Sequence, residues 1–270
     1  MKKSTASSAD SAQGQGSVEP SRVRIAGGLF SQGGGISFER HTSSMSVSRS
    51  EAGIATIEGR LTSPIARVPE AAAACGGIAV KGRTLKTFAA TTDVAVARNC
   101  NADALFAVYP FTGEPVITQA LMTVAQRPLF VGVGGGTTTG QRVVELAMIA
   151  EMQGAAGVVI NAPAPAETIE AVMSMVDIPV VATVLSDDEL VDAKIAAGAA
   201  IVNVAAGAAT PAVVAGIRAR YADMPILASG GAKESSIAAT IAAGADAVTW
   251  TPPSAQQIQS QMMDRYRAES

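Results

Sequence analysis

The sequence has little of what many binding and catalytic sites are built from. Its 270 residues include only one histidine and two cysteines, and aromatic residues make up 4%. Two cysteines are too few for a disulfide framework. One histidine and two distant cysteines also fall short of the several ligands that a zinc site needs. A formal net charge of −3 provides no basic footprint for nucleic acid.

Long apolar segments are also missing. Runs such as Ala196–Val204 are of strand or helix length and too short to span a bilayer. The chain begins Met1-Lys-Lys-Ser like a secretory signal, but residues 5–19 are polar and contain no apolar core region. We therefore expect a cytoplasmic protein that binds neither membrane nor nucleic acid.

What the chain does have is a repeated unit from Asn101 onward: a short apolar strand, a loop of small polar residues, and an amphipathic helix. Apolar strands without polar alternation are typical of a parallel sheet covered by helices. Together with a first strand ahead of Asn101, these units make eight and predict an α/β fold of the (β/α)8 TIM-barrel type. The predicted strands are Leu85–Ala90, Ala104–Tyr109, Leu129–Val133, Gly157–Asn161, Val180–Val184, Ala200–Val204, Ile226–Ser229 and Ala247–Thr251.

The chain ahead of the barrel divides into two parts. Residues 1–21 are rich in Ser, Ala, Gly and Gln and are predicted to form a disordered tail. Residues 22–83 are predicted to be a β-rich extension, with a strand near Val23–Phe30 and short strands or hairpins after it. The barrel then occupies residues 84–270. The extension is expected either to plug the bottom of the barrel or to pair with another copy in a homo-oligomer.

Polar residues recur near the ends of five consecutive predicted strands. Aligning the strands on Pro179, Pro225 and the Gly-Ala steps puts these residues at one height, near the carboxyl-terminal mouth. Active sites of such barrels lie at that face. The belt is therefore predicted either to face a ligand or to bond internally as a structural layer. Its members are Asn161, Thr183, Asn203, Ser229 and Thr249.

Two glycine-rich loops follow the third and seventh predicted strands. Ser229-Gly230-Gly231, with Lys233 just beyond, stands between a strand end and a helix start, where free N–H groups and the helix dipole favour an anion. Gly134, Gly135 and Gly136 have the same character half a barrel away. Both loops are predicted to bind phosphate or another polar group. A plain tight turn and a flexible lid are the alternatives.

The seventh and eighth units resemble the ribulose-phosphate-binding barrel superfamily, through Ile226-Leu-Ala-Ser-Gly-Gly231 and Ala242-Ala-Gly-Ala-Asp-Ala-Val248. The resemblance implies a phosphate site near Gly230 and Gly231. It also implies that Asp93 and Asp187 stand where histidine-biosynthesis barrels keep catalytic carboxylates. Thr251-Pro-Pro-Ser254 departs from the usual glycine-serine step. Because proline lacks an N–H donor, Gly230 and Gly231 would supply most of the binding.

Few residues could act as acids, bases or nucleophiles. Asp93 and Asp187 at opposed strand ends suit proton transfer next to a carbonyl, but each also suits a helix start. Lys86 is expected to bind phosphate or carboxylate at the mouth, with a Schiff base as the alternative. Glu114 is a reserve acid or base. His41, the one histidine, lies outside the predicted barrel, and no Gly-x-Ser-x-Gly elbow accompanies it.

These features predict an enzyme that acts on a small phosphorylated metabolite, as an isomerase, epimerase or aldolase-type lyase. One alternative is a hydrolase or lyase of an unphosphorylated molecule. The other is a non-catalytic regulator or assembly protein that binds the metabolite. No cofactor is identified from the sequence, and magnesium held by carboxylates stays open.

Overall fold

The structure, a computed structural model, describes residues 46–49, 55–59, 64–109 and 112–269. The chain divides into two compact units, Met1–Ser63 and Pro64–Ser270. In the first unit, β1 (Ser46–Arg49) pairs antiparallel with β2 (Ala55–Glu58). The predicted tail, the strand near Val23–Phe30 and His41 lie outside the described residues.

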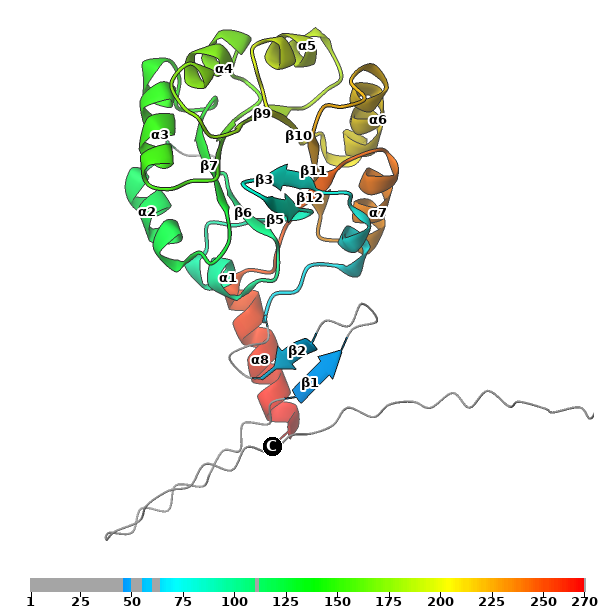
Figure 1. Cartoon of the computed structure of the whole chain (residues 1–270). Helices are drawn as coiled ribbons and strands as arrows, with labels where there is room; N and C mark the ends of the chain where they lie inside the picture. The colour runs from blue at the N-terminus through cyan, green and yellow to red at the C-terminus, as the bar shows by residue number, and fades with distance from the viewer. Residues whose placement is uncertain (1–45, 50–54, 60–63, 110–111, 270) are drawn as a thin grey trace, which may run out of the picture. The chain divides into compact units, whose positions relative to one another are not determined.

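The second unit is a closed barrel of eight parallel strands with helices around it (Figure 1). Its strands are β5 (Thr87–Ala90), β6 (Ala104–Ala107), β7 (Leu129–Gly134), β8 (Gly157–Ile160), β9 (Val180–Val184), β10 (Ile201–Val204), β11 (Ile226–Gly231) and β12 (Ala247–Trp250). Its helices are α1 (Val94–Asn99), α2 (Pro115–Val124), α3 (Gln141–Met152), α4 (Ala166–Met173), α5 (Glu189–Ala196), α6 (Thr210–Arg220), α7 (Glu234–Ala242) and α8 (Ala255–Glu269), with a short 3-10 turn η2 (Gly207–Ala209) before α6.

The predicted (β/α)8 barrel is confirmed. β9 has the predicted bounds. Gly154, Gly198 and Gly244, which follow α3, α5 and α7, all have positive φ as helix-ending glycines do. The first predicted strand is wrong in its first half. Leu85 belongs instead to β4 (Arg83–Leu85), which pairs antiparallel with β3 (Ile78–Val80) in a hairpin.

This hairpin closes the amino-terminal end of the barrel. Ile78, Val80 and Leu85 form one buried cluster with a residue from each of the eight barrel strands, drawn mainly from the strand starts. Figure 1 shows the hairpin drawn across the ring of strands. The amide of Gly77 donates to the carbonyl oxygen of Asp246 at 2.8 Å, which ties the hairpin to the loop before β12. The expected plug is therefore present, formed by residues 78–85.

The segment before the hairpin covers the outside of the barrel. The 3-10 helix η1 (Glu70–Ala74) packs against α7, and Ala72 and Cys75 are buried in the cluster that contains Val248 and Trp250 of β12. The Glu234 carboxylate at the start of α7 accepts from the amides of Glu70 and Ala71, each at 2.8 Å. Residues 64–83 therefore belong to the barrel unit, whose boundary precedes the expected one at 83/84.

Cys75 offers a pH test of this packing. Burial raises the pKa of the Cys75 thiol from 9.0 to about 11. A folded pKa above the unfolded one stabilises the fold below pH 9, and that contribution is lost as the pH rises toward 11. The difference between these two pKa values corresponds to about 2–3 kcal/mol of unfolding free energy. Between pH 9 and 11 the unfolding free energy of the wild type should fall more steeply than that of Cys75→Ala, measured by urea titration. Parallel slopes would contradict this.

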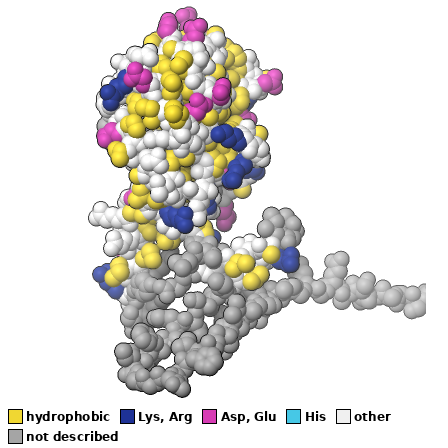
Figure 2. Space-filling view, turned by 60° about the vertical axis from the view of Figure 1, so that its left-hand side comes forward, with side chains coloured by type: hydrophobic (Ala, Val, Ile, Leu, Met, Phe, Trp, Pro, Cys, Tyr) yellow, Lys and Arg dark blue, Asp and Glu magenta, His cyan; other side chains and the backbone are white. Residues whose placement is uncertain are grey.

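The surface carries charges of both signs. The face in Figure 2 shows acidic and basic side chains interspersed with apolar ones over the barrel. Among the described residues, no helix combines the length and apolar character that crossing a bilayer requires.

Candidate functional site

The inside of the barrel changes from apolar to polar toward the mouth. The buried cluster next to the hairpin contains at least one residue from each barrel strand, among them Phe88, Phe106, Phe130, Val159, Val181, Ile201, Leu227 and Ala247. Because side chains alternate along a strand, the next inward position lies two residues later. On β5–β7 that position holds Ala90, Val108 and Gly132. On β8–β12 it holds the five residues of the predicted belt.

The belt is staggered rather than level, which corrects the prediction. Asn203 pairs in register with Thr183 on one side and Leu227 on the other, whereas Ser229 pairs with Thr249. Strands of a closed barrel tilt, so aligning their starts does not align their heights. Asn203 and Thr183 are buried, and the Asn203 amide donates from Nδ2 to Thr183 Oγ1 at 3.2 Å. Among the described residues, Asn203 Oδ1 is buried without a hydrogen bond.

A polar hollow lies at the mouth between the ends of β7 and β8. We call it the niche; its volume is about 20 Å³, and its walls include Gly132, Gly134, Gly136, Thr137, Thr138 and Asn161. Thr138 is 4% exposed, and its Oγ1 is a further buried atom without a hydrogen-bond partner in the described part of the chain. A space of this size takes about one water molecule. The niche therefore fits a single oxygen atom.

Glycines are required where the β7 loop crosses Asn161. A Cβ at Gly135, whose φ is +93°, would lie 2.7 Å from the carbonyl oxygen of Asn161 and 2.8 Å from its nitrogen. The Asn161 amide donates to the Gly134 carbonyl at 2.8 Å, and the Gly135 amide donates to the Thr138 carbonyl at 2.9 Å. These bonds fix the loop against the end of β8. They place Gly134, Gly135 and Gly136 of the predicted loop next to Asn161 of the predicted belt.

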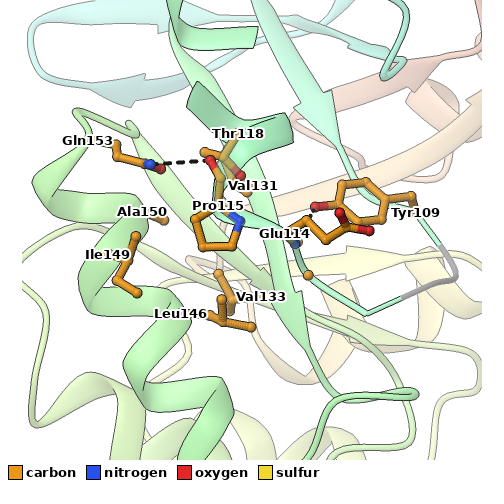
Figure 3. Close-up of a pocket in the computed structure, with 12 residues that line it drawn as sticks. Tyr109, Glu114, Pro115, Thr118, Val131, Val133, Leu146, Ile149, Ala150 and Gln153 are labelled. Atoms are coloured by element: carbon orange, nitrogen blue, oxygen red, sulfur yellow. Dashed lines mark hydrogen bonds between the residues drawn. The ribbon is translucent and has the colours of Figure 1, made fainter. Parts of the chain in front are cut away.

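The loop after β6 borders the niche from the other side. Tyr109 is buried and lines the niche with Gly113, and the Glu114 amide donates to its hydroxyl oxygen at 3.1 Å. The exposed Glu114 side chain lies beside the Tyr109 ring (Figure 3). On the outer side of β7, a second small hollow of about 10 Å³ is bordered by Glu114 and by Gln153, whose Nε2 donates to the Pro115 carbonyl at 3.2 Å. Glu114 is thereby placed at the mouth.

The β11 loop has the predicted strand-to-helix geometry. A Cβ at Gly230 would lie 2.9 Å from Ile237 and 3.2 Å from the Thr249 carbonyl oxygen, so only glycine fits there. Gly231 is exposed with φ +71°, and exposed Lys233 stands immediately before α7. Both β7 and β11 are six residues long, and the register of each shifts near its glycines. The two loops therefore share the similar character that the sequence indicates.

The four predicted catalytic residues have different surroundings. Asp93 lies at the mouth and caps α1, its Oδ1 accepting from the amides of Ala95 at 2.8 Å and Val96 at 3.3 Å. Asp187 forms an ion pair with Arg220 of α6, and its carboxylate occupies the space that a side chain at Gly216 would fill. It therefore points to the helix layer rather than across the mouth toward Asp93.

Lys86 requires a correction. It precedes β5, at the amino-terminal end of the barrel, and its Nζ donates to the Ala73 carbonyl of η1 at 3.0 Å. Because that end is opposite to the mouth, Lys86 does not reach a ligand there. Of the predicted catalytic residues, Asp93 and Glu114 remain at the mouth without an ion pair among the described residues.

Thr138 and Tyr109 were not singled out from the sequence. Both stand in loops rich in small or turn-forming residues, where the sequence signal is the glycines and prolines around them. In the part of the chain that the structure describes, no group of three or more His, Cys, Asp or Glu residues is placed to hold a metal ion.

Comparison with known protein families finds no match, and comparison with curated proteins finds none either. Solved structures do match. Phosphoenolpyruvate phosphomutase from Streptomyces platensis subsp. rosaceus is 16% identical over 68% of this chain and 81% of its own, with a TM-score of 0.53. A 2,3-dimethylmalate lyase, described as a PEP mutase/isocitrate lyase superfamily member, is 14% identical with the same coverage and TM-score. A phosphonopyruvate hydrolase, in complex with oxalate and Mg²⁺, is 17% identical over 68% of this chain and 80% of its own, with a TM-score of 0.51.

Identity this low establishes the barrel fold alone. The match to these solved structures confirms the barrel that the sequence resemblance implied, while membership of the ribulose-phosphate-binding superfamily stays a prediction. By these comparisons and by its own geometry, the chain from Pro64 onward is a (β/α)8 barrel similar in fold to small-molecule mutases, lyases and hydrolases.

Proposed function

We propose that the chain is an enzyme that acts on a small phosphorylated metabolite at the carboxyl-terminal mouth of the barrel. The observation that carries the proposal is that Thr138, a residue of the niche wall, has a buried hydroxyl without a hydrogen-bond partner in the described structure. Leaving a buried hydroxyl without a hydrogen bond costs about 1–3 kcal/mol. An oxygen atom of a bound phosphate would satisfy it.

The niche accepts one oxygen, and the rest of the metabolite lies over the mouth. The Asn161 side chain, 3.7 Å from a Cβ built at Gly136, borders the same space. Glycine walls allow the ligand to approach the backbone closely. The β11 loop, with Gly230, Gly231 and Lys233, provides a second grip on the opposite side of the barrel.

Proton transfer falls to the two predicted carboxylates that remain at the mouth. Glu114 is exposed beside Tyr109, and Asp93 uses Oδ1 to cap α1, which leaves Oδ2 to exchange a proton. Two carboxylates that act as acid and base on one bound sugar phosphate or keto-acid phosphate can support isomerisation, epimerisation or carbon–carbon cleavage. The fold neighbours, a phosphomutase, a dimethylmalate lyase and a phosphonopyruvate hydrolase, support this general class rather than one reaction.

The test is thermal unfolding against sugar phosphates and keto-acid phosphates, their unphosphorylated counterparts, and inorganic phosphate. A ligand at about 100 times its Kd stabilises the folded state by about 2.7 kcal/mol. Any stabilising compound is then incubated with the protein and followed by NMR for turnover. Stabilisation by phosphorylated compounds, with turnover, supports the proposal. Binding without turnover favours a regulator, equal binding of unphosphorylated compounds favours a hydrolase or lyase of those, and no stabilisation overturns the proposal.

Thr138→Val sharpens this test because it removes the hydroxyl and keeps the shape. The ligand-free variant should be as stable as the wild type or more stable, since an unsatisfied buried group is removed. Ligand affinity should fall about tenfold, the worth of one hydrogen bond. Thr139→Val, at an exposed neighbour, is the control and should change neither quantity. A ligand-free Thr138→Val protein that is clearly less stable would show that the hydroxyl has a structural partner instead.

A further inference from the structure

Lys194 is a buried cation on the outer side of the mouth. It is 3% exposed, although lysine is rarely this buried unless paired. Helix α5 places it three residues after buried Val191, on the face turned to the barrel. Its Nζ donates to the carbonyl oxygens of Ala162 at 2.7 Å and Thr183 at 3.0 Å. Two of its three N–H groups are thereby used.

No carboxylate neutralises this charge at contact distance. The ion pairs found in the described residues do not include Lys194. Asp188 lies close enough to act on it electrostatically, but its own oxygens accept from Ser186 Oγ at 2.6 Å and from the Leu190 amide at 3.0 Å. Burial lowers the pKa of Lys194, and the field of Asp188 opposes that shift without cancelling it. A buried charge without a partner is costly.

A hollow lies against this lysine. We call it the outer hollow; its volume is about 180 Å³, and Lys194 forms part of its wall. Most of the rest is apolar, including Val184, Leu185, Leu190 and Val191. Leu185 and Leu190 in this wall are 57% and 63% exposed. At about 30 Å³ for each water molecule, the space equals about six waters.

We propose that the outer hollow binds a small monocarboxylate with a short apolar chain. The carboxylate takes the remaining N–H of Lys194 and neutralises its charge. The chain packs against Val184, Leu185 and Leu190. The volume suits an acid of about four to six carbons, by the same comparison with water. Asp188, which also borders the hollow, repels a second carboxylate, so a dicarboxylate should bind more weakly.

This site is separate from the proposed catalytic one. The outer hollow and the niche have no lining residue in common. Asn161 of the niche directly precedes Ala162 of the outer hollow, whose carbonyl accepts from Lys194, so the two spaces lie near each other without sharing a side chain. The proposal therefore stands or falls independently of the reaction at the mouth.

Isothermal titration of the full-length protein with hexanoate tests the proposal, with hexanol and adipate as comparison ligands. We expect saturable binding of one hexanoate for each chain, and binding of hexanol and adipate at least about tenfold weaker, since a charge-assisted hydrogen bond is lost or a like charge is added. No saturable binding of hexanoate, or equal binding of hexanol, would overturn the proposal.

Two variants keep the test independent of folding. Lys194→Met removes the charge, and Leu190→Glu adds a negative charge at an exposed rim position without touching the core. Each should weaken hexanoate binding about tenfold or more. Met152→Glu, an exposed apolar helix residue on α3 changed in the same way, should bind hexanoate like the wild type. Unchanged binding in Leu190→Glu would refute the site even where Lys194→Met fails to fold.

Discussion

Replacing Phe130 by alanine is expected to lower the free energy of unfolding by about 3–5 kcal/mol, the range for a buried phenylalanine. Phe130 is 0% exposed inside the barrel, and its ring packs edge to face on Phe88 with centroids 5.1 Å apart. A Cβ at Gly157 would lie 2.5 Å from the Phe130 ring, so the ring fills the space over this glycine. The barrel wall cannot collapse inward to fill the cavity, because closed strands fix its radius.

Urea denaturation followed by circular dichroism measures this loss. Met152→Ala, at a side chain that is 83% exposed, is the control and should change stability by less than about 0.5 kcal/mol. If the alanine variant does not fold, Phe130→Leu gives a smaller loss in the same direction. A Phe130→Ala protein as stable as the control would mean that the inside of the barrel is not packed as the structure has it.

The strands of this barrel could be predicted because they are buried on both faces. Val180–Val184 is a run of apolar residues interrupted only by Thr183, and the structure gives the strand the same bounds. The split between β4 and β5 could not be predicted in this way. Leu85 and Phe88 both pack in the barrel core, so the apolar residues on either side of the boundary do not assign themselves to different strands. What separates the strands is the pairing of β4 with β3, a tertiary contact.

The glycines of the candidate site could be predicted from the sequence, whereas the contacts of its other side chains could not. Gly230 and Gly135 indicate places where backbone segments approach closely, and in the structure the space at both is too small for a Cβ. Asp187 and Arg220, which form an ion pair, are separated in the sequence by α5 and most of α6, so no local sequence pattern indicates their contact. The stagger of Asn203 and Ser229 follows from barrel tilt, which single strands do not encode. The burial of Lys194 had one signal, a lysine three residues after Val191 on an apolar helix face.

Gly136→Asp is expected to abolish the stabilisation of the protein by phosphorylated compounds. Gly136 is exposed, its φ is not positive, and a Cβ there meets only Asn161 Nδ2 at 3.7 Å, an ordinary contact. The fold should therefore accept the aspartate. Its carboxylate would stand at the niche and accept from the Asn161 amide, which the phosphate needs. Like charges brought together in this way cost several kcal/mol, so affinity should fall by about a hundredfold or more.

Gly76→Asp is the matched control, because it adds the same charge at an exposed glycine with nothing within 4 Å of its Cβ. It stands just before the hairpin at the opposite end of the barrel. Both variants should unfold at the same temperature without ligand, and only Gly76→Asp should be stabilised by phosphorylated compounds as the wild type is.

If Gly136→Asp keeps that stabilisation, the phosphate lies elsewhere. Because Gly231 has a φ of +71° that aspartate tolerates better than most residues, Gly231→Asp then distinguishes the β11 loop from the β7 loop. Loss of stabilisation in that variant alone would assign the phosphate to the start of α7, and the niche would hold another oxygen of the substrate.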